Sequence, residues 1–216
     1  MRSILVIGAG KFGSVLAESL EKYKNEVLLI DDDDDAVDRL TDVVTDVKIG
    51  DCTDPEVIKE IGVRDFDACF VCTASDFRAS MEITSNLHDA GAHLIISKAE
   101  SSRHAELLRK VGADEVIFPE KDMAERTALR FSVHGAFDCY MLAPEYAIFE
   151  LAVPSSWVGK NLKQLELRTR NKVNVIGYKT EQGVIPATDI SRDFTRGDHV
   201  LIAGYKSDII ALTNKN

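Results

Sequence analysis

Short apolar runs in the first half of the chain alternate with segments of helical periodicity. The segment from Lys11 to Lys22, for example, places Phe12, Val15, Leu16 and Leu20 on one face of a helix. The strands predicted from the apolar runs are 3–7, 26–30, 44–49, 67–73, 93–97 and 115–118, and helices are predicted at 11–22, 76–90 and 101–111. Strict alternation of nearly continuous apolar strands with helices indicates a doubly wound α/β fold, with a parallel sheet covered on both faces.

A further helix is predicted from Glu120 to about Val133, where Met123, Thr127 and Phe131 share one face. Pro119 precedes it and His134-Gly135-Ala136 ends it. Because the sheet is already complete, the apolar face of this helix is expected to bury itself elsewhere, most naturally against a second subunit.

The pattern changes after about residue 138, where short alternating strands are separated by turn residues. The predicted elements are strands 147–153, 173–179, 184–187 and 199–203, followed by a closing helix at 205–212. The sequence therefore predicts a Rossmann-like domain with its following crossover helix at 1–136, and a small α+β domain at 137–216.

A glycine motif stands where the first strand meets the first helix. Gly8, Gly10 and Gly13 have the G-x-G-x-x-G spacing of a dinucleotide-binding turn. In such a turn the first glycine allows the sharp exit from the strand, the second lets a pyrophosphate approach the backbone, and the third allows close packing of helix on strand. Asp31 ends the second strand about 20 residues on, where this fold places its ribose-binding acid. The aspartates from 31 to 35 would repel a 2′-phosphate, so NAD or an adenine nucleotide is favoured over NADP.

Composition excludes several classes of partner. The 216 residues carry a formal net charge of -10 and a pI of about 5.0, which argues against a nucleic-acid partner. We expect no membrane span and no signal peptide, because no apolar run is long enough and no charged leader opens the chain. The four cysteines suit a reducing compartment, and the spacing of Cys69 and Cys72 in a strand puts their sulfurs on opposite faces, which favours core packing over a metal site.

The glycine motif alone does not separate an enzyme from a sensor. A dehydrogenase needs a second domain that presents substrate and a general acid or base to the nicotinamide. None of the five histidines stands in a recognisable catalytic constellation, and the second domain is small for a substrate cleft. A nucleotide-binding module without chemistry is therefore favoured. A small NAD-dependent oxidoreductase stays as the alternative; a redox-sensing transcription regulator is third, and the absence of a basic recognition helix counts against it.

Several motifs extend beyond a generic Rossmann domain. They are Gly8-Ala9-Gly10-Lys11-Phe12-Gly13, Asp31, Ile49-Gly50-Asp51-Cys52-Thr53-Asp54, Ser97-Lys98-Ala99, Lys110-Val111-Gly112-Ala113-Asp114 and Phe118-Pro119-Glu120-Lys121-Asp122-Met123-Ala124. On these motifs the chain resembles the RCK (regulator of K⁺ conductance, or KTN) family over nearly its whole length. It is most similar to the KtrA/TrkA-type regulatory subunits of bacterial potassium uptake systems.

The resemblance implies a site for ATP, ADP or NAD(H). The phosphates would lie on the turn formed by Gly8, Ala9, Gly10, Lys11, Phe12 and Gly13, with the ribose on Asp31 beside Asp32 and the adenine near Asp51 and Cys52. Ala74 and Ser75 would border the ribose and phosphates, and Lys98 would add positive charge. Lys11 stands where relatives often carry an arginine, so the bidentate fork that would help distinguish ATP from ADP is missing. Glu120 matches a glutamate that binds a cation (Mg²⁺, Ca²⁺ or Na⁺) at the subunit interface; a first-turn acid on the helix dipole is the alternative.

The resemblance also implies an assembly. Homodimers would form an octameric ring on a separate integral-membrane K⁺-translocating subunit of the KtrB/TrkH type, so the chain is expected to be cytoplasmic and peripheral to the inner face of the membrane. Nucleotide binding would then control K⁺ flux by favouring one shape of the ring. In some relatives the second domain binds cyclic di-AMP; residues 165–168, 174–176 and Pro186 fall in the corresponding region.

Overall fold

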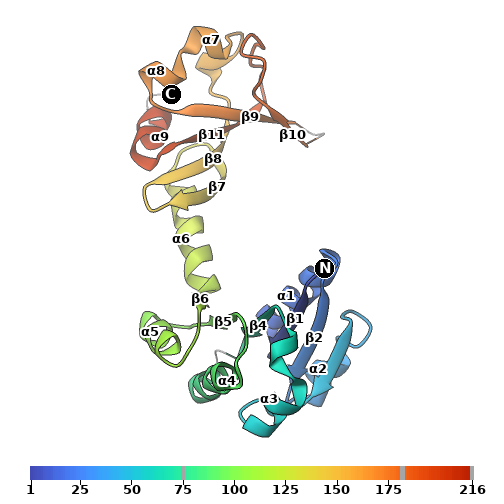
Figure 1. Cartoon of the computed structure of the whole chain (residues 1–216). Coiled ribbons are helices and arrows are strands. Elements are labelled where there is room, and N and C mark those ends of the chain that lie inside the picture. Colours follow the sequence, from blue (N-terminus) through green and yellow to red (C-terminus); the bar gives the residue numbers. More distant parts are fainter. Residues whose placement is uncertain (74–75, 181–182, 215–216) are drawn as a thin grey trace. The chain divides into compact units, whose positions relative to one another are not determined.

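The computed structural model describes residues 1–73, 76–180 and 183–214 (Figure 1). By their internal contacts these residues form two compact units, Met1–Glu120 and Lys121–Asn216. Each unit has its own sheet and its own hydrophobic core, so the two are described separately.

The first unit contains a six-stranded parallel sheet with the strand order β3-β2-β1-β4-β5-β6. This is the order of a Rossmann fold, in which the chain reverses direction across the sheet between β1 and β4. The strands are β1 (Ser3–Ile7), β2 (Glu26–Asp31), β3 (Asp46–Ile49), β4 (Ala68–Val71), β5 (Ile95–Lys98) and β6 (Glu115–Ile117). The doubly wound α/β fold predicted from the sequence is confirmed.

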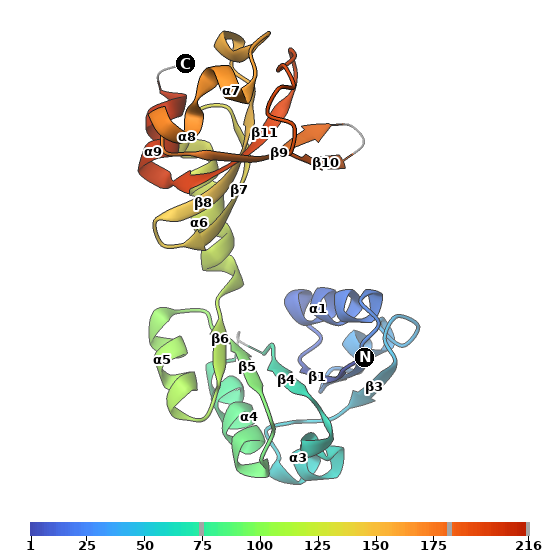
Figure 2. The ribbon, with the colours of Figure 1, turned by 45° about the horizontal axis from the view of Figure 1, so that its top comes forward.

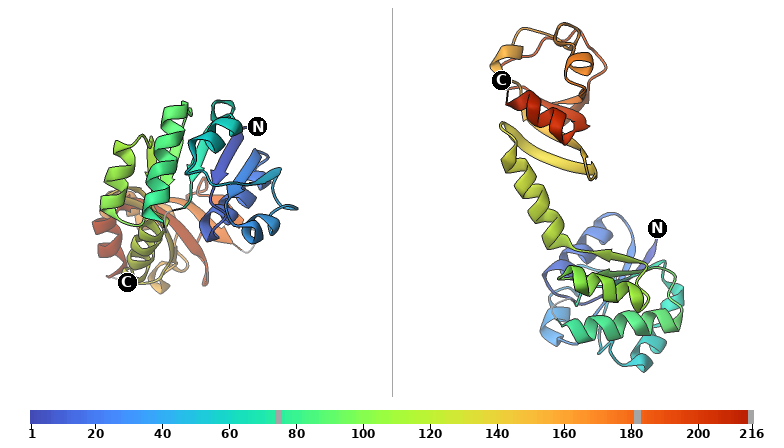
Figure 3. Two further views of the ribbon diagram at one scale, coloured as in Figure 1. Left: turned by 90° about the horizontal axis from the view of Figure 1, so that it is seen from below. Right: turned by 90° about the vertical axis from the view of Figure 1, so that its left-hand side faces the viewer.

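Helices cover both faces of this sheet. They are α1 (Lys11–Lys22), α2 (Asp34–Asp38), α3 (Pro55–Ile61), the 3-10 turn η1 (Val63–Asp65), α4 (Phe77–Ala90) and α5 (Ser102–Lys110). Figure 2 shows α1 on one face and α3 and α4 on the other, and Figure 3 shows α5 beside α4. Side chains at the N-caps, Asp33, Asp54, Asp76 and Ser101, accept backbone N–H groups and fix where α2, α3, α4 and α5 begin.

The two cysteines spaced three apart show the two-faced character of the sheet. Cys69 packs with Leu5, Ile58 and Leu87 in one cluster, whereas Cys72 belongs to the cluster on the opposite face. Both thiols are buried and unbonded. The sequence prediction that their sulfurs lie on opposite faces and pack in the core is confirmed.

The second unit is built on a five-stranded antiparallel sheet with the order β10-β9-β11-β8-β7. Its strands are β7 (Ala136–Ala143), β8 (Tyr146–Ala152), β9 (Asn174–Thr180), β10 (Gly183–Pro186) and β11 (His199–Tyr205). The remaining elements are the 3-10 turn η2 (Ser155–Trp157) and the helices α7 (Leu162–Leu165), α8 (Leu167–Arg170) and α9 (Lys206–Thr213). The predicted small α+β fold is confirmed, but the sequence did not predict β7, an edge strand on which only Cys139 is buried.

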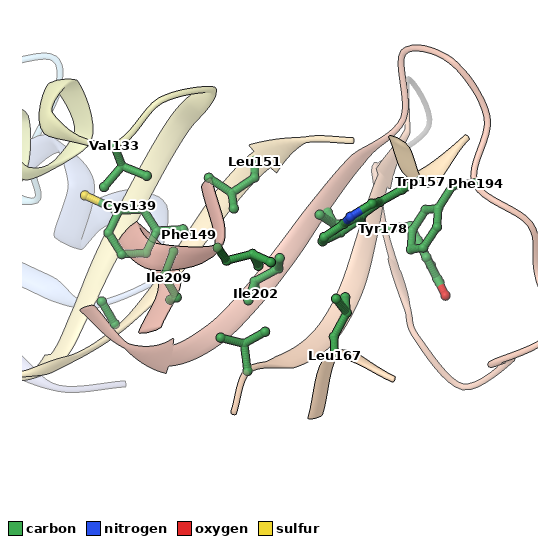
Figure 4. Packing of buried hydrophobic residues seen from close by; sticks show 14 residues of the cluster. Val133, Cys139, Phe149, Leu151, Trp157, Leu167, Tyr178, Phe194, Ile202 and Ile209 are labelled. Carbon is green, nitrogen blue, oxygen red and sulfur yellow. The ribbon is translucent and has the colours of Figure 1, made fainter. Parts of the chain in front are cut away.

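Aromatic and branched side chains fill the core of the second unit (Figure 4). Trp157 and Tyr178 both contact the ring of Phe194, with centroids 5.7 and 5.8 Å apart, and Phe149 is fully buried near Ile209 and Cys139. This core holds the only tryptophan of the chain, so tryptophan fluorescence reports on the second unit.

Helix α6 (Pro119–Ser132) contains the boundary between the units, and none of its residues is buried. The sequence placed the domain boundary after residue 136, which assigns this helix to the first domain. By contacts the division falls after Glu120 instead, because Leu129 and the following Val133 pack against the core of the second unit. Met123 and Phe131 of this helix are exposed.

Among the helices of the described residues, none is both long and apolar enough to cross a bilayer.

Candidate functional site: a nucleotide cleft

The glycine turn joins β1 to α1, and the surroundings of its three glycines differ. Gly8 has a φ of +105° and donates its N–H to the carbonyl oxygen of Ile30 at 2.8 Å. A Cβ on Gly13 would stand 1.9 Å from the carbonyl oxygen of Gly8, so no other residue fits there. A Cβ on Gly10 would meet nothing within 4 Å. The chain thus requires glycine for packing at position 13, whereas the space at position 10 lies open to a ligand.

Gly10 is also the N-cap of α1 and makes no side-chain hydrogen bond there. The first N–H groups of this helix therefore have no intrahelical or capping side-chain partner, and they stand at the positive end of the helix dipole. A helix start of this kind, open and next to a glycine turn, is suited to phosphate.

Asp31 is tied to the turn. It is the last residue of β2, and its carboxylate accepts the backbone N–H of Ala9 and, at 2.9 Å, that of Asp33. These contacts hold the carboxylate beside the carboxyl end of β1, where the strand order of the sheet reverses. Ligands of open α/β sheets bind at this position.

Two further acids stand close to Asp31. Burial, a hydrogen bond with Asp31 and the negative charges of Asp31 and Asp51 raise the pKa of Asp32. Asp51 accepts both the hydroxyl (2.6 Å) and the backbone N–H (2.9 Å) of Thr53, and these hydrogen bonds lower its pKa. These carboxylates can accept hydrogen bonds from hydroxyl groups such as those of a ribose. They would repel a phosphate group carried on the same ribose.

These acids border a cleft of about 60 Å³ between the carboxyl ends of β1, β2, β3 and β4. It is lined by Ile7, Gly8, Ile30, Asp31, Asp32, Gly50, Asp51, Cys52, Thr53, Thr73, Ala79 and Ile83. Cys52 lies at its base, and burial, reinforced by the nearby aspartates, raises the pKa of its thiol to about 12. Such a thiol is almost wholly protonated at neutral pH, so Cys52 acts as an apolar wall and not as a nucleophile.

Lys98 stands at the end of β5, apart from this cleft lining. Its Nζ lies 2.7 Å from Oε1 of Glu120 and 5.7 Å from the centroid of the Phe12 ring, and its side chain is only 12% exposed. Lys98 is the main cause of the lowered pKa of Glu120. The structure thus pairs two residues for which the sequence predicted different ligands, and it sets both beside the helix that follows the glycine turn.

The other predicted residues are placed as follows. Lys11 is exposed at the start of α1 and makes no ion pair with any described residue. Ala74 and Ser75 lie outside the described residues. Within those residues, no group of three His, Cys, Asp or Glu side chains is arranged to hold a metal ion, so a cation at Glu120 would need ligands from elsewhere.

Thr73, Ala79 and Ile83 line the cleft but were not predicted from the sequence. The Oγ1 of Thr73 is buried and has no hydrogen-bond partner among the described residues, which makes it an available polar group at the cleft wall. Its place directly after β4 was the usable signal, since the residues that follow the central strands of such a sheet line its ligand crevice. Ala79 and Ile83 come from α4, and only the packing of that helix brings them to the cleft.

Comparison with known proteins agrees with this geometry. Residues 4–119 match the TrkA-N domain and residues 146–215 match the TrkA-C domain. The chain is 31% identical over 208 residues to the Ktr system potassium uptake protein C of Bacillus subtilis, covering 96% of this chain and 94% of that protein. It is 30% identical over 203 residues to the Ktr system potassium uptake protein A of Vibrio alginolyticus, covering 94% and 92%.

Solved structures show the same fold. The GsuK channel superposes with a TM-score of 0.70 at 21% identity, over 98% of this chain and 39% of that one. A GsuK channel bound to NAD superposes with a TM-score of 0.68 at 21% identity, again over 98% of this chain and 39% of that one. The resemblance that the sequence motifs indicated is thereby confirmed: this chain belongs to the family of proteins that carry a TrkA-N domain followed by a TrkA-C domain.

Proposed function

We propose that this protein is the nucleotide-sensing regulatory subunit of a potassium uptake system. The observation that carries the proposal is the cleft at the carboxyl ends of β1, β2 and β4, where an open glycine turn faces a fixed Asp31. Relatives named as Ktr potassium uptake proteins match this chain over nearly its whole length and nearly all of theirs. The function of those relatives and the site in this chain point to the same role.

The ligand of the cleft is an adenine nucleotide or NAD(H). Its phosphates lie on the turn of residues 8–13, against the N–H groups that begin α1. Its ribose hydroxyls donate to Asp31 and Asp32, and its adenine lies against the Asp51–Cys52 side of the cleft. Lys11 begins α1 and Nζ of Lys98 lies 5.7 Å from the centroid of the Phe12 ring, so we assign the outer phosphates to these two cations. One solved GsuK structure contains NAD and another contains ADP, so both classes are known in proteins of this fold.

We assign two further ligands to the chain. A cation (Mg²⁺, Ca²⁺ or Na⁺) binds Glu120 at an interface between subunits, where a second chain supplies the ligands that one chain lacks. Cyclic di-AMP binds the groove between α7, α8 and β9, whose lining includes Arg168, Asn174 and Val175. Both assignments rest on the family resemblance together with the presence of these residues at a surface.

The assembly in this proposal consists of homodimers that form an octameric ring on an integral-membrane K⁺-translocating subunit. The exposed Met123 and Phe131 of α6 support a subunit contact at that helix. The nucleotide acts by binding one shape of the ring more tightly than another, since a ligand shifts an equilibrium only by its differential affinity. We place the protein in the cytoplasm, on the inner face of the membrane through its partner.

The protein is a regulator and not an enzyme in this proposal. The alternative, a small NAD-dependent oxidoreductase, needs an acid or base beside the nicotinamide. None of the five histidines lines the cleft. His104, for example, is only 2% exposed, its ring contacts that of Phe77, and burial lowers its pKa. Loss of NADH absorbance in the presence of small carbonyl substrates would support the enzyme and contradict the regulator.

Calorimetric titration of the purified chain with ATP, ADP, NAD⁺ and NADH, with and without magnesium, tests the proposal. We expect binding of at least one nucleotide and its loss in Asp31→Ala, with Asp46→Ala on the edge strand β3 as the matched control. Unchanged affinity in Asp31→Ala would remove the site assignment. Absence of binding for all four nucleotides would remove the sensing function.

A further inference from the structure

A second polar site lies in the other unit, on the face of the antiparallel sheet that points away from its core. Along β8, Phe149 and Leu151 point into the core, and along β11 Val200 and Ile202 do the same. Successive side chains of a strand point to opposite faces, so Glu150 and His199 point to the other side. Lys179 of β9 is paired with His199 in the strand register and flanks the buried Tyr178, so it shares that side.

Glu150 pairs with two other side chains on this face. Its side chain is 6% exposed although it carries a charge, and its two oxygens hold two different groups. One oxygen lies 2.6 Å from Nζ of Lys179 and the other lies 2.7 Å from Nδ1 of His199. Burial alone would raise the pKa of Glu150, but the hydrogen bonds from Lys179 and His199 outweigh burial and leave it lowered. A buried carboxylate thus fixes the positions of two donors that are themselves partly exposed.

An aromatic ring and a guanidinium complete the site. Phe137 of β7 stacks on the imidazole of His199, with centroids 4.1 Å apart and planes 34° apart, and it is 47% exposed. Arg196 is exposed in the loop before β11 and forms no ion pair with any described residue. These groups border a groove of about 830 Å³ that is lined by Phe137, Glu150, Lys179, Thr180, Ile185, Arg196, Gly197, Asp198 and His199.

Each of the two acids that line the groove, Glu150 and Asp198, has a basic partner. Glu150 is compensated by Lys179, and Asp198 is compensated by Arg192 at 3.2 Å and by the backbone N–H of Thr195. Asp138, near Lys179, is held by Arg126 at 2.8 Å. Among the described residues Arg196 has no acidic partner, in a protein whose formal net charge is -10. An uncompensated guanidinium beside an anchored ammonium and an imidazole selects for an anion.

We propose that this groove binds a small organic phosphate that carries a flat ring. The phosphate would be held by Arg196 and Lys179, beside the imidazole of His199, and the ring would lie on Phe137. The groove is separate from the nucleotide cleft, which belongs to the first unit, and from the cyclic di-AMP groove between α7, α8 and β9. The proposal is also independent of potassium uptake, because it uses only residues of the second unit.

The test uses the full chain with phenyl phosphate as the probe. Phenol and inorganic phosphate, each of which carries one half of the probe, are the comparison ligands. Isotope-edited NMR of the histidine rings locates binding, because His199 is the histidine that lines the groove. We expect phenyl phosphate to shift the His199 resonances in a saturable way, with each half-probe binding at least about tenfold more weakly.

Variants separate this site from the others. Arg196→Gln changes an exposed side chain without an ion-pair partner, so folding is expected to survive, and the affinity for phenyl phosphate should fall about tenfold. Phe137→Ser should reduce the preference for phenyl phosphate over inorganic phosphate. Arg168→Gln, an equally exposed arginine in the cyclic di-AMP groove, is the matched control and should bind as the wild type does.

Three outcomes would overturn the proposal: equal losses in Arg196→Gln and Arg168→Gln, calorimetric binding of phenyl phosphate that leaves the His199 resonances unshifted, or saturation behaviour that does not differ between phenyl phosphate and phenol. They point, in that order, to non-specific attraction, to binding elsewhere on the chain and to apolar contact alone. Nucleotide titration of the same variants distinguishes this result from failure of the proposed sensing function, since Arg196→Gln leaves the first unit unchanged.

Discussion

Nζ of Lys98 lies 2.7 Å from Oε1 of Glu120, so the last residue of β5 is joined to the first turn of α6. The side chain of Lys98 is mostly buried and that of Glu120 is mostly exposed. In the proposed function a nucleotide phosphate binds Lys98 and a cation binds Glu120. Each of these ligands therefore competes with the ion pair between the two side chains. The ion pair therefore couples the occupancy of the cleft to the start of the helix that follows β6.

Replacement of Glu120 by glutamine tests this coupling. In magnesium-free buffer Glu120→Gln should bind ADP up to about fivefold more tightly than the wild type, because Lys98 is no longer neutralised; the modest size reflects an exposed partner. Lys98→Gln should bind ADP about tenfold more weakly. Calorimetry measures both constants. If Glu120→Gln matched the wild type without a cation, the ion pair would have no role in binding.

Two glycine variants separate folding from binding. Gly13→Ala should destabilise the first unit by about 3 kcal/mol, because its Cβ would stand 1.9 Å from the carbonyl oxygen of Gly8. Gly10→Ala meets nothing within 4 Å and should cost less than about 1 kcal/mol, yet weaken ADP binding at least about tenfold by filling the phosphate position. Circular dichroism melts and ADP titrations check the pair, and the Trp157 signal serves as an internal reference for the second unit. Equal ADP affinity in Gly10→Ala and wild type would contradict the assigned phosphate position.

Acid should weaken the second unit through Glu150. Hydrogen bonds in the folded protein hold its pKa below the 4.5 of an exposed glutamate, so its stabilising contribution is present above about pH 4.5 and is lost as pH falls through the lowered pKa. Glu150→Gln should cost about 2 kcal/mol at pH 7, less than for a fully buried pair because Lys179 is half exposed.

As the pH falls, the free energy of unfolding of Glu150→Gln should decrease less than that of the wild type. Urea unfolding followed by Trp157 fluorescence from pH 7 down to pH 3 measures this difference, with Glu145→Gln, an exposed acid in the β7–β8 turn, as the control. Parallel pH curves for Glu150→Gln and wild type would contradict the lowered pKa.

The thiols should be unreactive in the folded protein. All four cysteines are buried, and burial raises the pKa of Cys52, Cys69 and Cys72 to about 12. Labelling with Ellman's reagent at pH 8 should proceed only as fast as the protein opens, and four equivalents should react at once in denaturant. Rapid reaction of Cys52, suppressed by nucleotide, would instead favour a redox-sensing role.

The sequence predicted the first unit well because two strong periodic signals agree there. Buried parallel strands are apolar along their whole length, and helices such as α4 and α5 begin at capping residues that can be read directly. Edge strand β7 escaped prediction because its one buried residue, Cys139, gives no alternation. Ala79 and Ile83 also escaped prediction, because a helix face that lines a cleft has the same periodicity as one that packs in a core.

The sequence by itself determined the doubly wound fold, the glycine turn and the acid that ends β2, because each depends on local geometry or on a fixed spacing along the chain. The tertiary structure alone decided which distant groups meet. It brought Glu120 to Lys98, Ala79 and Ile83 to the cleft wall, and Lys179 and His199 to the buried Glu150. These meetings depend on strand order and register, and no local pattern encodes which strands become neighbours.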